Sequence, residues 1–512
     1  MRPGVRILDP KTAARLPGQQ RLRPTAYVGD QLIVTGAPTE SARGALQEAA
    51  RRSGLRVEIA DDAPHLRTEA LARQVGLVVE PALQSQTARL VPLDDQPAPP
   101  PDAWQVLQNY RALVGAQDAS ATHVALDHVL WAGPVTSGHP VTSGHPVTSG
   151  HPVTSGHPVT GGPWEEYVYP GWGGRQPVAW TGSRPTRTPD DQLHCRRPVV
   201  AVLDTGIGSH PWLPKDIVLD SPSVMGLPIG MRDPATDPEH SGVVLDPLEG
   251  ELDSDSGHGT FIAGLIRQGC PDANILAVRV MNSDGVVPES ELIEALKRLL
   301  LRQTLAQAAQ DAHEVIDVVV LSLGYYHEDL EDLKFDPVLL GVLRGLGVAG
   351  VAVVAAAGNE ATTAPMYPAA FSPYPGGEVG EFEADCVPVI SVGALNPDRS
   401  TAIFSNAGPW ISCRRPGAAV VSTFPVTFDG SAQPANETPA DGGGWRGTID
   451  PDNFAGGFGV WSGTSFAAPV LAAEIAQALF DGSAGPIDAP DRASAVGRAW
   501  NAITARIGIL RP

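Results

Sequence analysis

Four polar residues in separate short motifs could together carry out nucleophilic chemistry, and Ser465 is the nucleophile among them. Ser465 follows Gly463-Thr464 and begins an apolar helical run, so its hydroxyl lies near the positive end of a helix dipole. A hydroxyl attacks effectively at neutral pH only beside a histidine base that a third group orients. A serine in this position also caps helices, so the motif alone leaves a capping role open.

The sequence offers a base, an orienting carboxylate and an oxyanion donor. Asp204 ends the apolar strand-like run 197–204, and His258 begins a second apolar helical run after Ser256-Gly257. Asn359 follows a third apolar run, and its side-chain amide could donate to an oxyanion. Each residue has a structural alternative, since Asp204 could cap a turn and His258 a helix. Their joint occurrence favours a serine-based acyl transfer.

These motifs resemble the subtilisin-like serine proteases, the subtilases of peptidase family S8. Asp204 stands in LDTGI, His258 in GHGT, Asn359 in AAGN and Ser465 in GTSFAAP, in the family's order of aspartate, histidine and serine. The resemblance covers roughly residues 196–480. It implies a serine endopeptidase, a hydrolase of peptide bonds that acts through this catalytic triad and an acyl-enzyme intermediate.

The resemblance also implies a role for each site residue. Ser465 attacks the scissile carbonyl, His258 takes the serine proton and passes it to the leaving amine, and Asp204 holds the imidazole. Asn359 and the backbone N–H of Ser465 form the oxyanion hole. This chemistry requires no cofactor, and no metal ligand is assigned to the site.

By the same resemblance, two uncharged segments are expected to flank the pocket that holds the substrate side chain just before the cleaved peptide bond. They are Ser322-Leu323-Gly324 and Ala356-Ala357-Gly358. Their composition favours broad or apolar specificity in protein or peptide substrates. The nearby acidic residues Asp255 and Glu360 leave a preference for basic residues open.

The elements that position these residues alternate between apolar strands and helices, which predicts an α/β fold with a subtilisin-like parallel sheet flanked by helices. The predicted strands lie near 198–203, 274–280, 316–322, 350–356 and 388–394. The predicted helices lie near 258–268, 289–309, 335–346 and 465–480.

Three parts are expected along the chain: a small α/β domain at 1–115, a linker at 116–195 and the catalytic domain at 196–512. The first part resembles, in its alternation of elements, the prodomains that precede many subtilases and block the cleft. An unrelated regulatory or interaction domain has the same architecture. The alternative function is therefore a protease-fold regulatory or binding protein kept latent by its N-terminal half. The elements predicted in this half are strands at 31–35, 55–59, 76–80 and 87–91 and helices at 40–53, 66–75 and 102–114.

A repeated GHPVTS unit within 133–161 marks the linker. It places His139, His145, His151 and His157 six residues apart. A proline in every unit, and the lack of a neighbouring carboxylate or cysteine, favour a flexible linker over a metal site.

The composition limits which partners the protein is expected to bind and in which compartment it is expected to act. The formal charge of −21 argues against nucleic acid or an anionic membrane as a partner. No run approaches the ~20 apolar residues of a membrane span, and the N-terminus lacks the apolar core of a signal peptide. A cytoplasmic location is expected, with secretion left open. The four widely separated cysteines are expected to be free thiols.

An acidic loop, 231–256, accounts for the long spacing between Asp204 and His258. Its residues Glu251, Asp253 and Asp255 leave a structural calcium ion open, because some family members bind one. Their spacing matches no calcium-binding loop, so a solvated acidic loop is the favoured interpretation.

Overall fold

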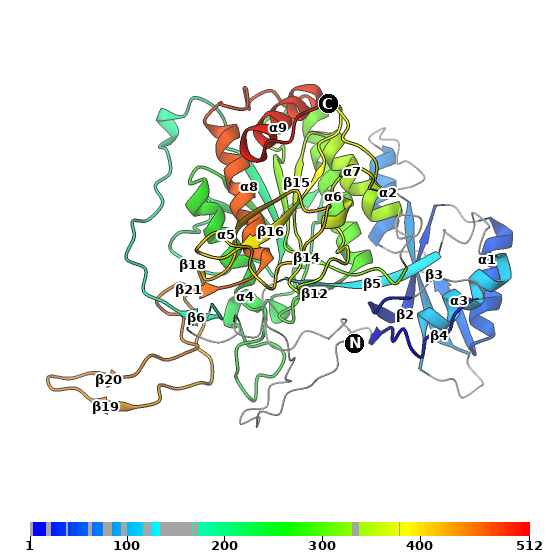
Figure 1. Cartoon of the computed structure of the whole chain (residues 1–512), viewed down its shortest axis with the longest axis horizontal. Coiled ribbons are helices and arrows are strands. Elements are labelled where there is room, and N and C mark those ends of the chain that lie inside the picture. Colours follow the sequence, from blue (N-terminus) through cyan, green and yellow to red (C-terminus); the bar gives the residue numbers. More distant parts are fainter. Residues whose placement is uncertain are drawn as a thin grey trace.

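The computed structural model (Figure 1) describes residues 4–16, 22–36, 39–59, 64–74, 84–93, 100–115, 124–133, 167, 171, 173–329, 337–377 and 379–512. The GHPVTS repeats after residue 133 and the strand predicted at 76–80 lie outside these residues. Two sheets organise the described chain, a parallel one in the C-terminal part and an antiparallel one in the N-terminal part.

The C-terminal part is built on a seven-stranded parallel sheet of order β17-β16-β15-β13-β7-β11-β8. Its central strands are continuous apolar runs that are buried on both faces, as helices on both sides of a parallel sheet require. The five predicted strands are confirmed, and they share this sheet with two others, β8 and β17. The strands are β7 (Val199–Asp204), β8 (Val218–Leu219), β11 (Asn274–Arg279), β13 (Val318–Leu321), β15 (Ala352–Ala356), β16 (Val389–Leu395) and β17 (Cys413–Pro416).

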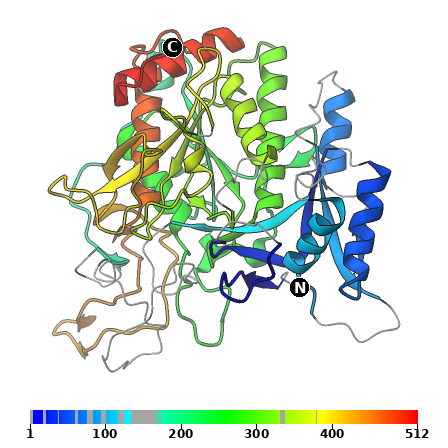
Figure 2. The same cartoon turned by 45° about the vertical axis from the view of Figure 1, so that its right-hand side comes forward.

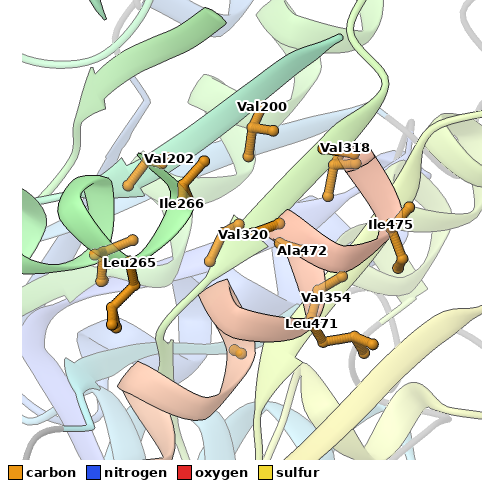
Figure 3. Close-up of a cluster of buried hydrophobic side chains, with 14 of the residues drawn as sticks. Val200, Val202, Leu265, Ile266, Val318, Val320, Val354, Leu471, Ala472 and Ile475 are labelled. Atoms are coloured by element: carbon orange, nitrogen blue, oxygen red, sulfur yellow. The ribbon is translucent and has the colours of Figure 1, made fainter. Parts of the chain in front are cut away.

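Helices cover both faces of this sheet, and the four predicted helices are confirmed. On one face α5 (His258–Gly269) and α8 (Thr464–Phe480) pack on the strands, and α9 (Arg492–Ile507) packs on α8. On the other face lie α6 (Glu289–Ala308) and α7 (Pro337–Val348). Figure 3 shows how aliphatic side chains of α5 and α8 meet the valines of three strands, β7, β13 and β15. Those side chains are Leu265, Ile266, Leu471, Ala472 and Ile475, against Val200, Val202, Val318, Val320 and Val354.

The N-terminal part is an antiparallel sheet covered by amphipathic helices. Its strands follow the order β5-β2-β4-β3, with β1 beside β2. Apolar residues of α1 and α3 pack with this sheet into a separate core. The elements are β1 (Val5–Ile7), β2 (Ala26–Thr35), α1 (Glu40–Arg51), β3 (Leu55–Ile59), α2 (Pro64–Gln74), β4 (Ser85–Pro92), α3 (Ala103–Val114) and β5 (Val124–Ala132).

Strand β5 links the two parts and lies inside the range 116–195 that the sequence analysis expected to be linker. One edge of β5 pairs with β2 and, near the end of β5, with β14 (Leu323–Gly324) of the C-terminal part. The opposite edge pairs with β12 (Val286–Pro288), also of the C-terminal part. Every residue of β5 is buried. The N-terminal sheet therefore extends through β5 to two short strands of the C-terminal part, and the long β5 arrow that joins the two parts is visible in Figures 1 and 2.

Shorter elements complete the C-terminal part. A small sheet joins β18 (Val420–Thr423), β21 (Phe458–Trp461) and β6 (Gln176–Pro177), and the β19–β20 hairpin extends away from the body in Figure 1.

All four cysteines are free, which confirms that expectation. In the described residues, no helix has both the length and the apolar character needed to span a bilayer. The remaining short elements are β9 (Ser223–Val224), β10 (Leu227–Pro228), α4 (Pro238–Ser241), β19 (Glu437–Pro439) and β20 (Trp445–Gly447).

Candidate active site

Asp204 and His258 are joined by a short hydrogen bond between the last residue of β7 and the first residue of α5. The Nδ1 of His258 lies 2.7 Å from Oδ1 of Asp204, and both side chains are buried. Asp204 reaches this position because β7 ends there, and its Oδ1 also accepts from the backbone N–H of Thr205 at 2.8 Å. The contact fixes the tautomer that carries its proton on Nδ1, so the lone pair of Nε2 is available as a base.

The pKa of His258 reflects two opposed effects. Complete burial disfavours the charged imidazolium, but the negative charge and hydrogen bond of Asp204 outweigh this, so the pKa is raised above its ordinary value. The rings of Trp461 and Phe466 surround the imidazole at centroid distances of 5.9 and 5.3 Å. The histidine is therefore a base held in a dry, aromatic environment.

A buried carboxylic acid that the sequence analysis did not single out ties these two residues together. Oε1 of Glu239 accepts from the hydroxyl of Thr205 at 2.5 Å and from the backbone N–H of Gly257 at 3.1 Å, and its Oε2 accepts from the hydroxyl of Thr260. Burial raises the pKa of Glu239 to about 8 despite these donors. Glu239 thus links Thr205, the residue after Asp204, to Gly257, the residue before His258, and to Thr260, two residues after it. In the sequence it is one of many acids in the loop 231–256, and nothing local distinguishes it.

Ser465 occupies the first turn of α8, with Gly463 as the residue before the helix. Pro469 lies four residues later and has no N–H to donate to the carbonyl of Ser465. The hydroxyl of Ser322 donates to that carbonyl instead, at 2.8 Å, so Ser322 helps to fix the start of the helix. The hydroxyl of Ser465 donates to the backbone oxygen of Ser322 at 3.1 Å.

The hydrogen bond between the serine and the histidine is not formed in this arrangement. Within the described residues, Nε2 of His258 is buried without a hydrogen-bond partner. The Ser465 hydroxyl is directed instead toward the backbone oxygen of Ser322.

The two expected oxyanion donors converge on one oxygen, the backbone carbonyl of Gly133. The side-chain amide of Asn359 donates to it, and the backbone N–H of Ser465 donates from 3.4 Å. Asn359 is held in turn, because its Oδ1 accepts from the backbone N–H of Thr464 at 2.9 Å. Its own backbone N–H donates to the carboxylate of Glu360 at 2.8 Å. Gly133 itself was not predicted, because its partners lie far away along the chain.

The segment before Gly133 lies against the candidate site as an added strand. Gly133 donates its N–H to the carbonyl of Ser322 at 3.1 Å, and Ala132 donates to Gly285 at 2.7 Å. Ladder pairing continues from Leu323 to Ala132 and from Val286 to Trp131. Strand β5 therefore covers the site, which explains why all four candidate residues are buried.

The two segments expected to flank the substrate pocket differ in their surroundings. Leu323 and Gly324 form β14 along β5, and Ser322 contacts both Gly133 and Ser465. Gly358 donates its N–H to the hydroxyl of Thr464 beside the nucleophile. Ala356 pairs with Val392 in the parallel sheet, and Ala357 donates to the carbonyl of Val392.

The acidic residues of the loop 231–256 do not gather around a common point. Oδ2 of Asp253 accepts from the backbone N–H groups of Val244 and Leu245 at 2.8 and 3.1 Å, so this carboxylate holds the loop. Glu251 is exposed, and Oδ2 of Asp255 accepts from the hydroxyl of Ser254 at 2.6 Å. Among the described residues, these acids are not part of any ligand group that could hold a metal ion.

Comparison with known proteins gives one family match and several distant relatives. The model of the family described as "Subtilase family" matches residues 196–482. The chain is 26% identical over 260 residues to an intracellular serine protease of Paenibacillus polymyxa, which covers 47% of this chain and 64% of that protein. It is 28% identical over 187 residues to the subtilase-type proteinase psp3 of Schizosaccharomyces pombe, covering 36% and 35%. It is 28% identical over 241 residues to the major intracellular serine protease of Bacillus subtilis (strain 168), covering 44% and 60%.

The matched part spans about a third to two thirds of the length of these relatives. Among solved structures, a cold-adapted subtilisin-like serine proteinase is 20% identical, with a TM-score of 0.34, and covers 62% of this chain and 86% of that one. A lanthipeptide protease is 20% identical with a TM-score of 0.37, covering 56% and 73%.

Proposed function

Since this chain belongs to the subtilase family, we propose that it is a serine endopeptidase whose cleft is occupied by its own N-terminal half. The observation that carries the proposal is the position of the Gly133 carbonyl oxygen. It accepts from Asn359 and from the backbone N–H of Ser465, the two donors that would stabilise the oxyanion of a scissile carbonyl.

The chemistry follows from the contacts around Ser465. The serine oxygen attacks the carbonyl carbon while His258 Nε2 takes its proton, and the negative charge that forms on the carbonyl oxygen is held by the oxyanion donors. Collapse of this intermediate breaks the C–N bond, and the imidazolium returns the proton to the leaving nitrogen. Asp204 stabilises the imidazolium through the 2.7 Å contact. Water then repeats the sequence on the acyl-enzyme, so no cofactor takes part.

Substrates are proposed to be extended protein or peptide chains. The strand β5 supports this, because it lies between β12 and β14 and pairs with both in the antiparallel sense. A substrate would take the same place and make the same main-chain hydrogen bonds, so affinity would come largely from the backbone. The relatives named intracellular serine proteases support a place inside the cell.

The N-terminal half is proposed to act as a resident inhibitor. Residues 124–133, rather than the region before residue 115, make the contacts that support this role. The next residue in the sequence is Pro134. The peptide bond presented to Ser465 thus has a tertiary nitrogen as its leaving group, which lacks an N–H and carries a ring carbon in its place. Such a bond would be seated like a substrate but cut slowly.

The test is covalent labelling of the full chain with a fluorophosphonate, read by intact mass. A Cβ added at Gly133 would lie 2.9 Å from Oγ of Ser465, so Gly133→Val should push the segment out of the cleft. We expect slow labelling of the wild type, faster labelling of Gly133→Val and none of Ser465→Ala. If wild type and Gly133→Val both stay unlabelled while circular dichroism shows them folded, the endopeptidase proposal is wrong and a binding protein of this fold remains.

A further inference from the structure

A buried group of two imidazoles and one carboxylate lies where β5 meets the segment that follows β14. His128 belongs to β5, while His327 and Glu328 follow β14 after two tyrosines. Each of the three side chains is only 1% exposed. One ligand atom from each residue lies within 4.8 Å of the other two. The catalytic chemistry uses none of these residues.

One distance within this group equals the separation of two ligands around a small tetrahedral ion, and a second distance is shorter by a few tenths of an ångström. Oε2 of Glu328 lies 2.9 Å from Nε2 of His128 and 3.4 Å from Nδ1 of His327. Two ligands bound to Zn²⁺ at 2.0–2.1 Å and a tetrahedral angle lie ~3.4 Å apart. The two rings are tilted by 48° with centroids 4.9 Å apart, so they do not stack face to face.

The second ring nitrogen of His128 has the kind of hydrogen-bond partner that orients metal-binding histidines. Its Nδ1 lies 2.8 Å from Oε2 of Glu289, the first residue of α6, and Tyr325 stacks on the ring at 4.5 Å. A carboxylate on Nδ1 places the proton there, which directs the lone pair of Nε2 toward Glu328 and His327. Glu289 thus orients His128 as carboxylates orient histidine ligands in zinc sites.

We infer that His128, His327 and Glu328 bind a divalent transition metal ion of the Zn²⁺ type, with Glu289 as the orienting carboxylate. Two imidazoles and one carboxylate are a donor set that such ions take, and a water molecule completes a tetrahedral site. The metal replaces the proton that otherwise bridges His128 and Glu328. It also replaces the 3.2 Å contact that the backbone N–H of Asp329 makes with Nδ1 of His327.

The site joins the two halves of the molecule, because one ligand comes from β5 and two come from the C-terminal part. A bound ion therefore fastens β5 beside β14, five residues before the Gly133 carbonyl. Any effect of the metal on proteolysis rests on the proposed function. Metal binding does not depend on that function, so it is tested in a chain that lacks the nucleophile Ser465.

The experiment is a titration of the full chain with Co²⁺, whose visible absorption reports four-coordinate binding. The chain carries Ser465→Ala to prevent self-cleavage, and glutamine replaces the four repeat histidines, which would otherwise bind the ion. We expect one equivalent of Co²⁺ with the intense bands of a tetrahedral site, and loss of these bands in Glu328→Gln, which keeps the shape of the side chain. Glu289→Gln should weaken Co²⁺ binding by about 10–100-fold, as loss of an orienting carboxylate does.

The matched control is His313→Ala, which removes an exposed histidine and should bind as the parent does. Near-ultraviolet circular dichroism of each variant establishes that its packing is native. If the parent binds no Co²⁺ at one equivalent, or Glu328→Gln binds it equally well, the group is a hydrogen-bonded network only and the inference is wrong. A third outcome separates the two proposals. If the Ser465→Ala chain binds Co²⁺ but the chain that keeps Ser465 never reacts with fluorophosphonate, the metal site stands and only the proposed proteolysis is wrong.

Discussion

The backbone N–H of Ser465 donates to the carbonyl oxygen of Gly133 at 3.4 Å, so the proposed nucleophile and the end of the N-terminal half share one hydrogen bond. The side-chain amide of Asn359 donates to the same oxygen. A carbonyl held by two oxyanion donors is polarised for attack, yet the bond beyond it leads to Pro134. Four expectations concern this site and its surroundings.

Replacement of Pro134 by alanine should accelerate self-cleavage after Gly133. The leaving nitrogen then carries a hydrogen in place of a ring carbon, so His258 can approach it to deliver the proton. We expect at least about a tenfold faster appearance of the two fragments, equivalent to about 1.4 kcal/mol in the barrier. Intact mass followed over time measures this rate. Pro140→Ala, six residues further on, is the control, and equal rates for the two variants would show that the proline does not protect the bond.

Asn359→Ala should slow cleavage strongly without abolishing it. In subtilisin, loss of one side-chain oxyanion donor costs about 10²–10³ in turnover, while the backbone donor remains. The self-cleavage rate in a Pro134→Ala background gives a single-turnover measurement of this effect. Asn436→Ala, an exposed residue before β19, should leave the rate unchanged. A loss below fivefold would mean that Asn359 does not carry oxyanion charge.

The rate of self-cleavage should rise with pH through the raised pKa of His258. The neutral imidazole is the form that accepts the serine proton, and the charge of Asp204 keeps the ring protonated to a higher pH than usual. The midpoint of the rate profile should therefore lie above the ordinary histidine value of about 6.5. The rate of Pro134→Ala across a buffer series measures it. A midpoint well below that value would contradict the attraction between Asp204 and His258.

Glu239→Gln should become relatively more stable than the wild type as pH rises. Burial raises the pKa of Glu239 to about 8 in the folded chain, whereas an exposed glutamate ionises near 4.5. As pH rises, the Glu239 side chain therefore loses its proton in the unfolded chain before it does so in the folded chain. The stability that the neutral acid contributes is complete below pH 4.5 and is lost as pH rises through about 8. Melting temperatures of both proteins across this interval measure the effect. A constant difference between the two would show that Glu239 is already ionised when folded.

The fold and the motifs were predictable from the sequence where the signal is local. Runs such as 199–204 and 352–356 are buried on both faces and read as mostly apolar strands, and the helix 258–269 reads as an apolar run that is buried on all sides for most of its length. Glycines at the motif positions also have a local cause. A Cβ on Gly259 would lie 2.0 Å from the carbonyl of Gly206, so the approach of α5 to the end of β7 requires glycine there.

The remaining features depend on contacts between distant residues. Strand β5 has a largely apolar sequence, and only its pairing with β12 and β14 reveals that it lies against the candidate site. Glu239 is one acid among many until burial against Thr205 and Thr260 distinguishes it. His128 and Glu328 are likewise 200 positions apart. Periodicity and local motifs carry no information about such pairs.

Strand β5 pairs both with β2 of the N-terminal part and with β12 of the C-terminal part, and this determines how inhibition would respond to the concentration of the protein. While the chain is intact, the occupant of the cleft is tethered to it, so the local concentration is set by geometry and diluting the protein cannot release the enzyme. Once the chain is cut after Gly133, the same strand becomes a separate ligand that leaves with its sheet, and occupancy follows mass action. A single cleavage would thus convert a dilution-independent block into a dissociable complex, so that activity per molecule would rise as the cut protein is diluted.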